Sequence, residues 1–159
     1  MSEELANLAK RIREEVELIE RSLQKTDEGW RVFQASGNED YLDSVALNLH
    51  GFYSGLERIF EFVAEVIDGT KPSGENWHQT LLRQAATERP SVRPAVISID
   101  SCNHLDEFRR FRHVVRNAYT FKFDPVKIAQ LIDQTPRLFS QLQAELLAFA
   151  DFLDQAVSD

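Results

Sequence analysis

The segment DYLDSVALNLHGFYSGLERIFEFVAEVI, residues 40–67, decides the fold class of this chain. Its apolar residues recur every three or four positions, which places them on one face of an α-helix. They are Leu42, Val45, Leu49, Phe52, Leu56, Ile59, Phe60 and Val63. We expect this segment to be the longest helix and the centre of the core. It ends at DGTKPSG, residues 68–74, a loop rich in residues that favour turns.

Helical periodicity also precedes this segment. Residues 2–25 carry apolar side chains at intervals of three and four, with charged residues between them, which predicts an amphipathic helix. A shorter helical turn is expected over residues 30–33, ending at the stop signal of residues 36–38.

Three further helices are expected on the C-terminal side. Asn76 can cap a short helix that runs to Ala85, and prolines interrupt the irregular region that follows. The next helix runs to about residue 119. Asp124 and Pro125 then open the last helix, which Pro136 should kink or split in two.

Four long helices with short connections and no convincing strand predict an all-α fold. The expected architecture is an up-and-down helical bundle of four long helices plus short extra helices. At 159 residues the chain fits a single domain, residues 1–159, in which residues 1–38 are a candidate N-terminal helical extension.

Composition excludes several classes of protein. The lone Cys102 cannot form an internal disulfide, and no segment has the roughly 18 uninterrupted apolar residues that span a bilayer. We therefore expect a cytoplasmic protein without membrane contact. The net charge of −8 argues against a domain that binds nucleic acid over its whole surface, so a polyanion would need a local patch.

One segment concentrates positive charge. RRFRHVVR, residues 109–116, holds four arginines and no acidic residue. At about 100° per residue, one helical face carries three of these arginines together with an imidazole and a phenol. These residues are Arg109, Arg112, His113, Arg116 and Tyr119, whereas Phe108, Phe111, Val115 and Ala118 form a separate apolar arc.

Arginines on one face repel one another unless carboxylates or an anion offset their charge. Asp106 and Glu107 lie at the right helical spacing to pair with Arg109 and Arg110. Glu57 could also reach the arginine cluster of residues 109–116 from across the bundle. The alternative is a phosphate-binding and RNA-cleaving site, because guanidinium groups suit phosphate oxygens and stabilise the charge of phosphodiester cleavage.

The run FRHVVRNAY, residues 111–119, resembles the signature of the HEPN superfamily and specifically of the HepT-like ribonuclease toxins. That signature is an arginine, a polar residue, three further residues, a histidine, one residue and a tyrosine. Residues 52–60 and 77–82 also resemble segments of one HepT-like subfamily. The resemblance covers about residues 40 to 155.

The resemblance implies an all-α homodimer in which the motifs of two subunits face each other across a cleft. In active relatives the motif cuts RNA without metal or cofactor and leaves a cyclic phosphate. It also implies a small nucleotidyltransferase antitoxin as partner, which modifies the motif tyrosine. Arg112 takes the arginine position, His113 the polar position and Tyr119 the tyrosine position, so Tyr119 would be the modified residue.

Asn117 stands at the histidine position of this signature. An asparagine cannot exchange a proton near neutral pH, whereas an imidazole can serve as a general acid or base. His113 lies one helical turn away and could substitute. Arg109, Arg112 and Arg116 would then hold the phosphate, and Asn117 would donate a hydrogen bond.

Three functions therefore stay open. The first is a HepT-like toxin-type RNase with Arg112, His113 and Asn117 at the catalytic positions. The second is a catalytically silent HEPN module that binds a nucleotidyltransferase partner, a nucleotide or RNA. The third is a structural dimeric bundle in which carboxylates neutralise every arginine. His50 and His78 lie within amphipathic helical patterns and are interpreted as structural histidines. Together with His104 they have no zinc-ligand spacing, so no metal is expected.

Overall fold

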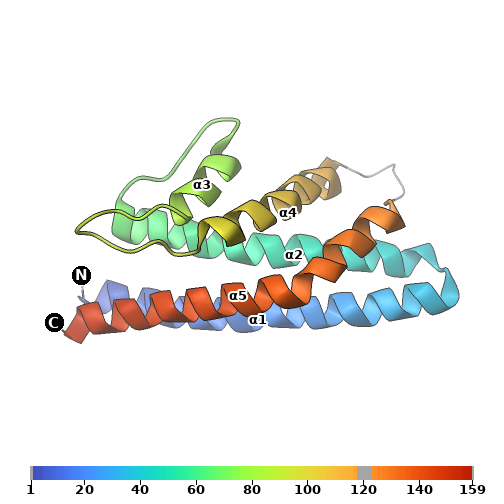
Figure 1. The fold of residues 1–159 in the computed structure, drawn as a ribbon, viewed down its shortest axis with the longest axis horizontal. Coiled ribbons are helices and arrows are strands. Elements are labelled where there is room, and N and C mark those ends of the chain that lie inside the picture. Colours follow the sequence, from blue (N-terminus) through green and yellow to red (C-terminus); the bar gives the residue numbers. More distant parts are fainter. Residues whose placement is uncertain (1, 118–122, 159) are drawn as a thin grey trace.

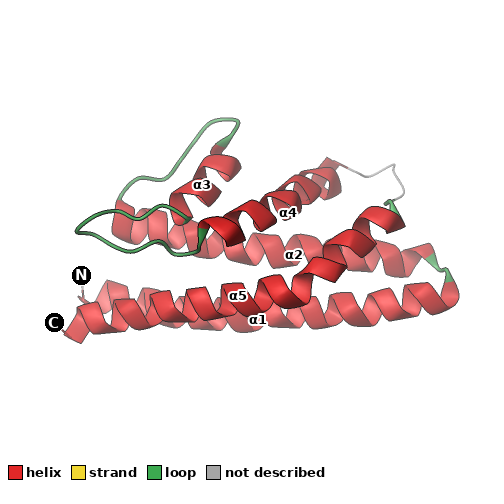
Figure 2. Ribbon diagram, in the orientation of Figure 1, coloured by secondary structure: helices red, strands yellow, loops and turns green. Residues whose placement is uncertain are grey.

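The computed structural model describes residues 2–117 and 123–158, and every regular element within these ranges is a helix (Figure 2). The elements are α1 (Ser2–Ser36), α2 (Glu39–Val63), a π-helical segment (Ala64–Asp68), α3 (Trp77–Ala85), α4 (Ile99–Asn117) and α5 (Pro125–Ser158). The predicted all-α fold class is confirmed.

The long helices α1, α2, α4 and α5 lie side by side and alternate in direction, so that the two ends of the chain meet at one end of the bundle (Figure 1). α1 packs against α2 and α5, whereas α4 packs mainly against α2. The short α3 contacts both α2 and α4. Apolar side chains from all five α-helices form one hydrophobic core, which confirms the predicted up-and-down bundle.

α1 is longer than the sequence pattern indicated. The short helical turn expected at residues 30–33 belongs to the same continuous helix, which has 35 residues. Trp30 and Phe33 pack against the core and extend the contact of α1 with the bundle. The helix ends before Gly37, whose φ of 68° is left-handed and whose N–H donates to the carbonyl of Phe33.

α2 is the central helix but not the longest, because its 25 residues are fewer than the 35 of α1 and the 34 of α5. Its final turn widens into the π-helical segment, so the α-helical pattern predicted to residue 67 stops at Val63. The segment ends at Gly69, which adopts a left-handed φ of 65°.

α5 begins as predicted and continues through its proline. Asp124 Oδ1 accepts a hydrogen bond of 2.9 Å from the N–H of Val126, which confirms Asp124 as the cap. Pro136 does not split the helix, since α5 runs unbroken from Pro125 to Ser158. In Figure 1 the N-terminal part of α5 turns away from the line of the remainder.

A buried ion pair holds α3 and the following loop against the end of α2. Asp68 accepts hydrogen bonds from Arg93 Nε at 2.7 Å, Arg93 Nη2 at 2.8 Å and Gln84 Nε2 at 2.7 Å. Arg93 also donates to the carbonyls of Thr87, Pro94 and Gln84. Burial opposes ionisation of Asp68, but the bonds from Arg93 and Gln84 outweigh it and hold the pKa of Asp68 below its usual range.

Among the described residues, no helix is long and apolar enough to cross a lipid bilayer.

Candidate functional site

α4 presents two faces, as its pattern predicts. Phe108 and Phe111 are buried in the core and Val115 is partly buried against it. Phe108 makes an edge contact with Phe52 of α2, with ring centroids 5.3 Å apart. Because these aromatic side chains hold α4 against α2, the arginine face is turned toward α3 and solvent.

Among the arginines of the cluster whose side chains the structure describes, Arg112 is the most enclosed, with 16% of its side chain exposed. Its Nε donates to Ser54 Oγ at 3.2 Å, and its Nη2 lies 3.6 Å from Glu57 Oε1. Its Nη1 lies 3.2 Å from Nδ1 and 3.5 Å from Nε2 of His78. Three side chains from two other helices therefore define the position of this guanidinium.

Glu57 contacts both His78 and Arg112. Its Oε2 lies 2.6 Å from Nδ1 of His78, while its Oε1 faces Arg112. Only 5% of the Glu57 side chain is exposed, so both contacts form with little competing water. Because a carboxylate only accepts hydrogen bonds, Nδ1 of His78 is the donor to Glu57.

Arg109 and Arg110 share one carboxylate on their own helix. Arg109 Nε donates to Asp106 Oδ1 at 2.8 Å, and Arg110 Nη2 lies 3.2 Å from Asp106 Oδ2. The predicted pairing with Asp106 is confirmed. Glu107 instead approaches α5, where its Oε2 lies 3.6 Å from Lys127 Nζ and accepts a hydrogen bond from Gln134.

The arginine face borders a cavity of about 320 Å³, which we call the arginine–histidine pocket. It is lined by residues of α4, of α3 and of the turn before α3: Glu75, Asn76, His78, Gln79, Arg109, Arg110, Arg112 and His113. Its volume is near the lower end of the range for small-ligand sites, about 300–1,000 Å³. Three guanidinium groups and two imidazoles thus line one concave surface.

A buried phenol lies behind this pocket. Tyr53 of α2 is fully buried, and its hydroxyl has no hydrogen-bond partner among the described residues. Burial raises the pKa of Tyr53, and the negative charge of Glu57 raises it further. The Tyr53 phenol therefore stays neutral.

The structure brings three of the predicted site residues together, since Arg109, Arg112 and His113 line the same cavity. Arg116 and Asn117 belong to the last turn of α4, but their side chains are outside the part that the structure describes. Tyr119 lies outside the described residues altogether.

Two other residues of the site, Ser54 and His78, were not predicted. His78 was interpreted as structural because it follows an amphipathic helical pattern, and nothing in that pattern indicates that α3 lies beside α4. Glu57 was a candidate to reach the cluster, and it does, whereas its neighbour Arg58 pairs with Glu15 of α1 at 2.7 Å. Residues 52–60 and 77–82, which carry the family resemblance, contain all three side chains that contact Arg112.

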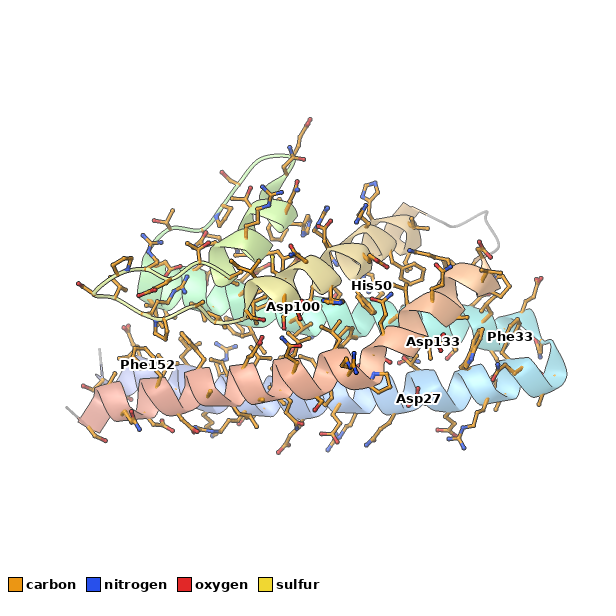
Figure 3. The ribbon with its side chains drawn as sticks, in the orientation of Figure 1. Asp27, Phe33, His50, Asp100, Asp133 and Phe152 are labelled. Carbon is orange, nitrogen blue, oxygen red and sulfur yellow. The ribbon has the colours of Figure 1, made fainter. Side chains whose placement is uncertain are left out.

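A second polar cavity lies between α4 and α5 and has a different character. Its lining includes Asp100 and Asp133, which Figure 3 labels, together with His104 and Arg137. Within residues 2–117 and 123–158, no three His, Cys, Asp or Glu side chains gather as ligands for a metal ion. The concentration of guanidinium groups distinguishes the arginine–histidine pocket from this cavity.

Comparison with known families identifies the family of the chain. A family model described as HepT-like protein matches residues 44–153. The chain belongs to the HepT-like family. The HepT-like match runs from α2 into α5 and includes Glu57, His78 and Arg112, whereas α1 precedes it. Neither the curated protein sequences nor the solved structures gave a match to the chain.

Proposed function

We propose that this HepT-like protein is a toxin-type ribonuclease that cuts RNA without a metal ion at the arginine–histidine pocket. The observation that supports the proposal is the shared cavity, in which guanidinium and imidazole groups line one surface. Guanidinium groups bind phosphate oxygens and stabilise the charge that develops at phosphorus during cleavage. An imidazole moves protons near neutral pH.

In this proposal Arg112 holds the scissile phosphate, because its position is defined by Ser54, Glu57 and His78. Arg109 and Arg110 share a single carboxylate and keep positive charge for neighbouring phosphates. His113 is exposed, lines the same cavity and supplies proton transfer in place of Asn117. Arg116 is the remaining candidate for RNA binding.

The test is cleavage of a mixed RNA substrate by purified protein with a chelator present. We expect the parent to cut and Arg112→Ala to lower the rate by about 10²–10³-fold, the usual loss when one charge-stabilising donor is removed. Arg58→Ala is the matched control, since Arg58 is a half-exposed arginine of α2 outside the pocket. An inert parent, or activity that the chelator removes, would overturn the proposal.

A second candidate is a HEPN-type module that binds without catalysis. Arg109, Arg110 and Arg112 each have a carboxylate within 3.6 Å, and this observation favours a neutralised cluster. Binding of a non-cleavable 2′-deoxy oligonucleotide without cleavage of the matching RNA would support this candidate.

The partners belong to the same proposal. We expect a homodimer that brings two pockets together, and a nucleotidyltransferase antitoxin that modifies Tyr119. Light scattering of the purified chain tests the dimer. Expression beside the neighbouring genes, followed by mass measurement of the Tyr119 peptide, tests the partner. A monomer, or an unmodified tyrosine beside an active nucleotidyltransferase, would contradict these expectations.

A further inference from the structure

The arginine–histidine pocket contains a second imidazole that the family signature does not include. His78 is the second residue of α3, 34 positions before Arg112 in the sequence, and it lines the cavity together with His113. We propose that His78, oriented by Glu57, is the proton acceptor in RNA cleavage and that His113 is the proton donor. This inference rests on the proposed function.

The contact with Glu57 determines which nitrogen of His78 is available. Nδ1 lies 2.6 Å from Glu57 Oε2 and donates to it, so the proton of the neutral ring is on Nδ1. Nε2 then carries the lone pair. A histidine whose second nitrogen is held by a carboxylate has the arrangement that orients general bases in many hydrolases.

Arg112 does not occupy that lone pair. Its Nη1 lies at nearly equal distances, 3.2 and 3.5 Å, from the two ring nitrogens. A donor that pointed directly at the lone pair of Nε2 would lie much farther from Nδ1 than from Nε2. The guanidinium therefore lies beside both ring nitrogens and is not aligned with the lone pair of Nε2. The side chain of His78 is 20% exposed and lines the cavity, so a ligand in the cavity can approach the ring.

The carboxylate of Glu57 also places His78, the proposed base, next to Arg112, the proposed phosphate-binding group. Glu57 contacts His78 with one oxygen and approaches Arg112 with the other. A phosphate bound by Arg112 would therefore lie next to the ring of His78. The nucleotide 2′-hydroxyl is adjacent to this phosphate, so its proton would face Nε2.

The proposed step balances in atoms and protons. The 2′ oxygen attacks phosphorus while its proton passes to Nε2 of His78. The bond from phosphorus to the 5′ oxygen breaks, and the leaving oxygen takes a proton from protonated His113. The products are a 2′,3′-cyclic phosphate and a 5′-hydroxyl, and both histidines recover their starting states by exchange with water. Arg112 stabilises the charge on the non-bridging oxygens.

The test separates the two proton transfers. After the parent has defined a cleavage site, a short RNA is made with oxygen or with sulfur at the 5′ bridging position of that site. A thiolate leaves without a proton donor, so the sulfur substrate removes the need for His113. His78→Gln keeps an N–H that can donate to Glu57 but cannot accept the substrate proton.

We expect His78→Gln to lower kcat by about 10²–10⁴-fold on both substrates, the usual range for general base catalysis. His113→Gln should lose activity on the oxygen substrate and recover it on the sulfur substrate. Affinity of His78→Gln for a 2′-deoxy analogue, and its circular dichroism melting curve, should match the parent. His104→Gln, a change at an exposed histidine of α4, is the control and should leave kcat unchanged.

The outcomes are distinguishable. If the parent cleaves and His78→Gln cleaves equally well, or if sulfur restores the activity of His78→Gln, the role of His78 is wrong while the proposed ribonuclease stands. If the parent cleaves neither substrate, the proposed function fails, and the role of His78 fails with it.

Discussion

Nδ1 of His78 lies 2.6 Å from Oε2 of Glu57 and joins the start of α3 to the buried face of α2. Glu57 is therefore the negative group shared by two cations, His78 when protonated and Arg112. The stability of the fold and the chemistry of the pocket depend on the same carboxylate.

Glu57→Gln should lower the free energy of unfolding by about 1–3 kcal/mol, because it leaves the largely buried Arg112 without its carboxylate. Urea unfolding followed by circular dichroism measures this change. Glu61→Gln, one turn later on α2, is the control. Glu61 pairs with the half-exposed Lys71 at 3.5 Å, and such pairs contribute about 0–1 kcal/mol. If Glu57→Gln and Glu61→Gln lowered the free energy of unfolding equally, the central role of Glu57 would be contradicted.

Gly55→Ala should destabilise the packing of α2 on α1. A Cβ at this position would lie 2.7 Å from Cγ1 of Ile19, so the helices must move apart at a cost of about 1–3 kcal/mol. Gly51→Ala is the control, because its nearest contact is Ser22 Oγ at an ordinary 3.5 Å. That variant should be neutral or more stable by up to about 1 kcal/mol, since alanine favours helix. If Gly55→Ala melted at a higher temperature than Gly51→Ala, the packing argument would be refuted.

Asp68→Asn should remove a pH-dependent part of the stability. The pKa of Asp68 is lowered in the folded protein, so this carboxylate stabilises the fold fully above its unfolded pKa of about 3.9. That contribution disappears as the pH falls through the lower, folded pKa. Urea unfolding at pH 7 and near pH 3 should give a larger difference between parent and variant at pH 7. Asp151→Asn, in an exposed pair with Arg13, should show little difference at either pH. A loss of unfolding free energy in Asp68→Asn that does not depend on pH would contradict the lowered pKa of Asp68.

Asn117→His should raise the rate of RNA cleavage, because it places an imidazole at the histidine position of the family signature. A general acid or base contributes about 10²–10⁴-fold, so we expect a gain within or below this range. Asn103→His adds an exposed histidine near the other end of α4 and should leave the rate unchanged. A rate that Asn117→His does not alter would show that the existing histidines already carry out the proton transfers. Cleavage by this variant alone would instead favour the binding module.

The fold could be predicted closely from sequence because helical periodicity is a local signal. The cap at Asp124 follows from the residues at the start of α5, and the apolar arc of Phe108 and Phe111 follows from spacing within α4. The π-helical segment could not be predicted this way, since its wider turn does not interrupt the apolar pattern of α2. The continuity of α1 was missed because Gly29 and polar residues weaken the pattern, while Trp30 and Phe33 still pack on the core.

The site was predicted only in part, because some of its contacts lie within one helix and others join several helices. The arginine face of α4 is a property of one helix, and so is the pairing of Asp106 with Arg109 and Arg110. The contacts of Arg112 with Ser54, Glu57 and His78 join three helices, and no spacing within a single segment encodes them.

The short helix α3 is held at both ends by carboxylates of the helix beneath it, through Glu57 at His78 and through Asp68 at Gln84. A helix of nine residues is too short to be stable alone in water, so these two attachments, together with the buried Leu81, Leu82 and Ala85, define its position. α3 is therefore poorly suited to swing as a lid over the pocket. We expect the pocket to select its ligand by a shape that exists before binding.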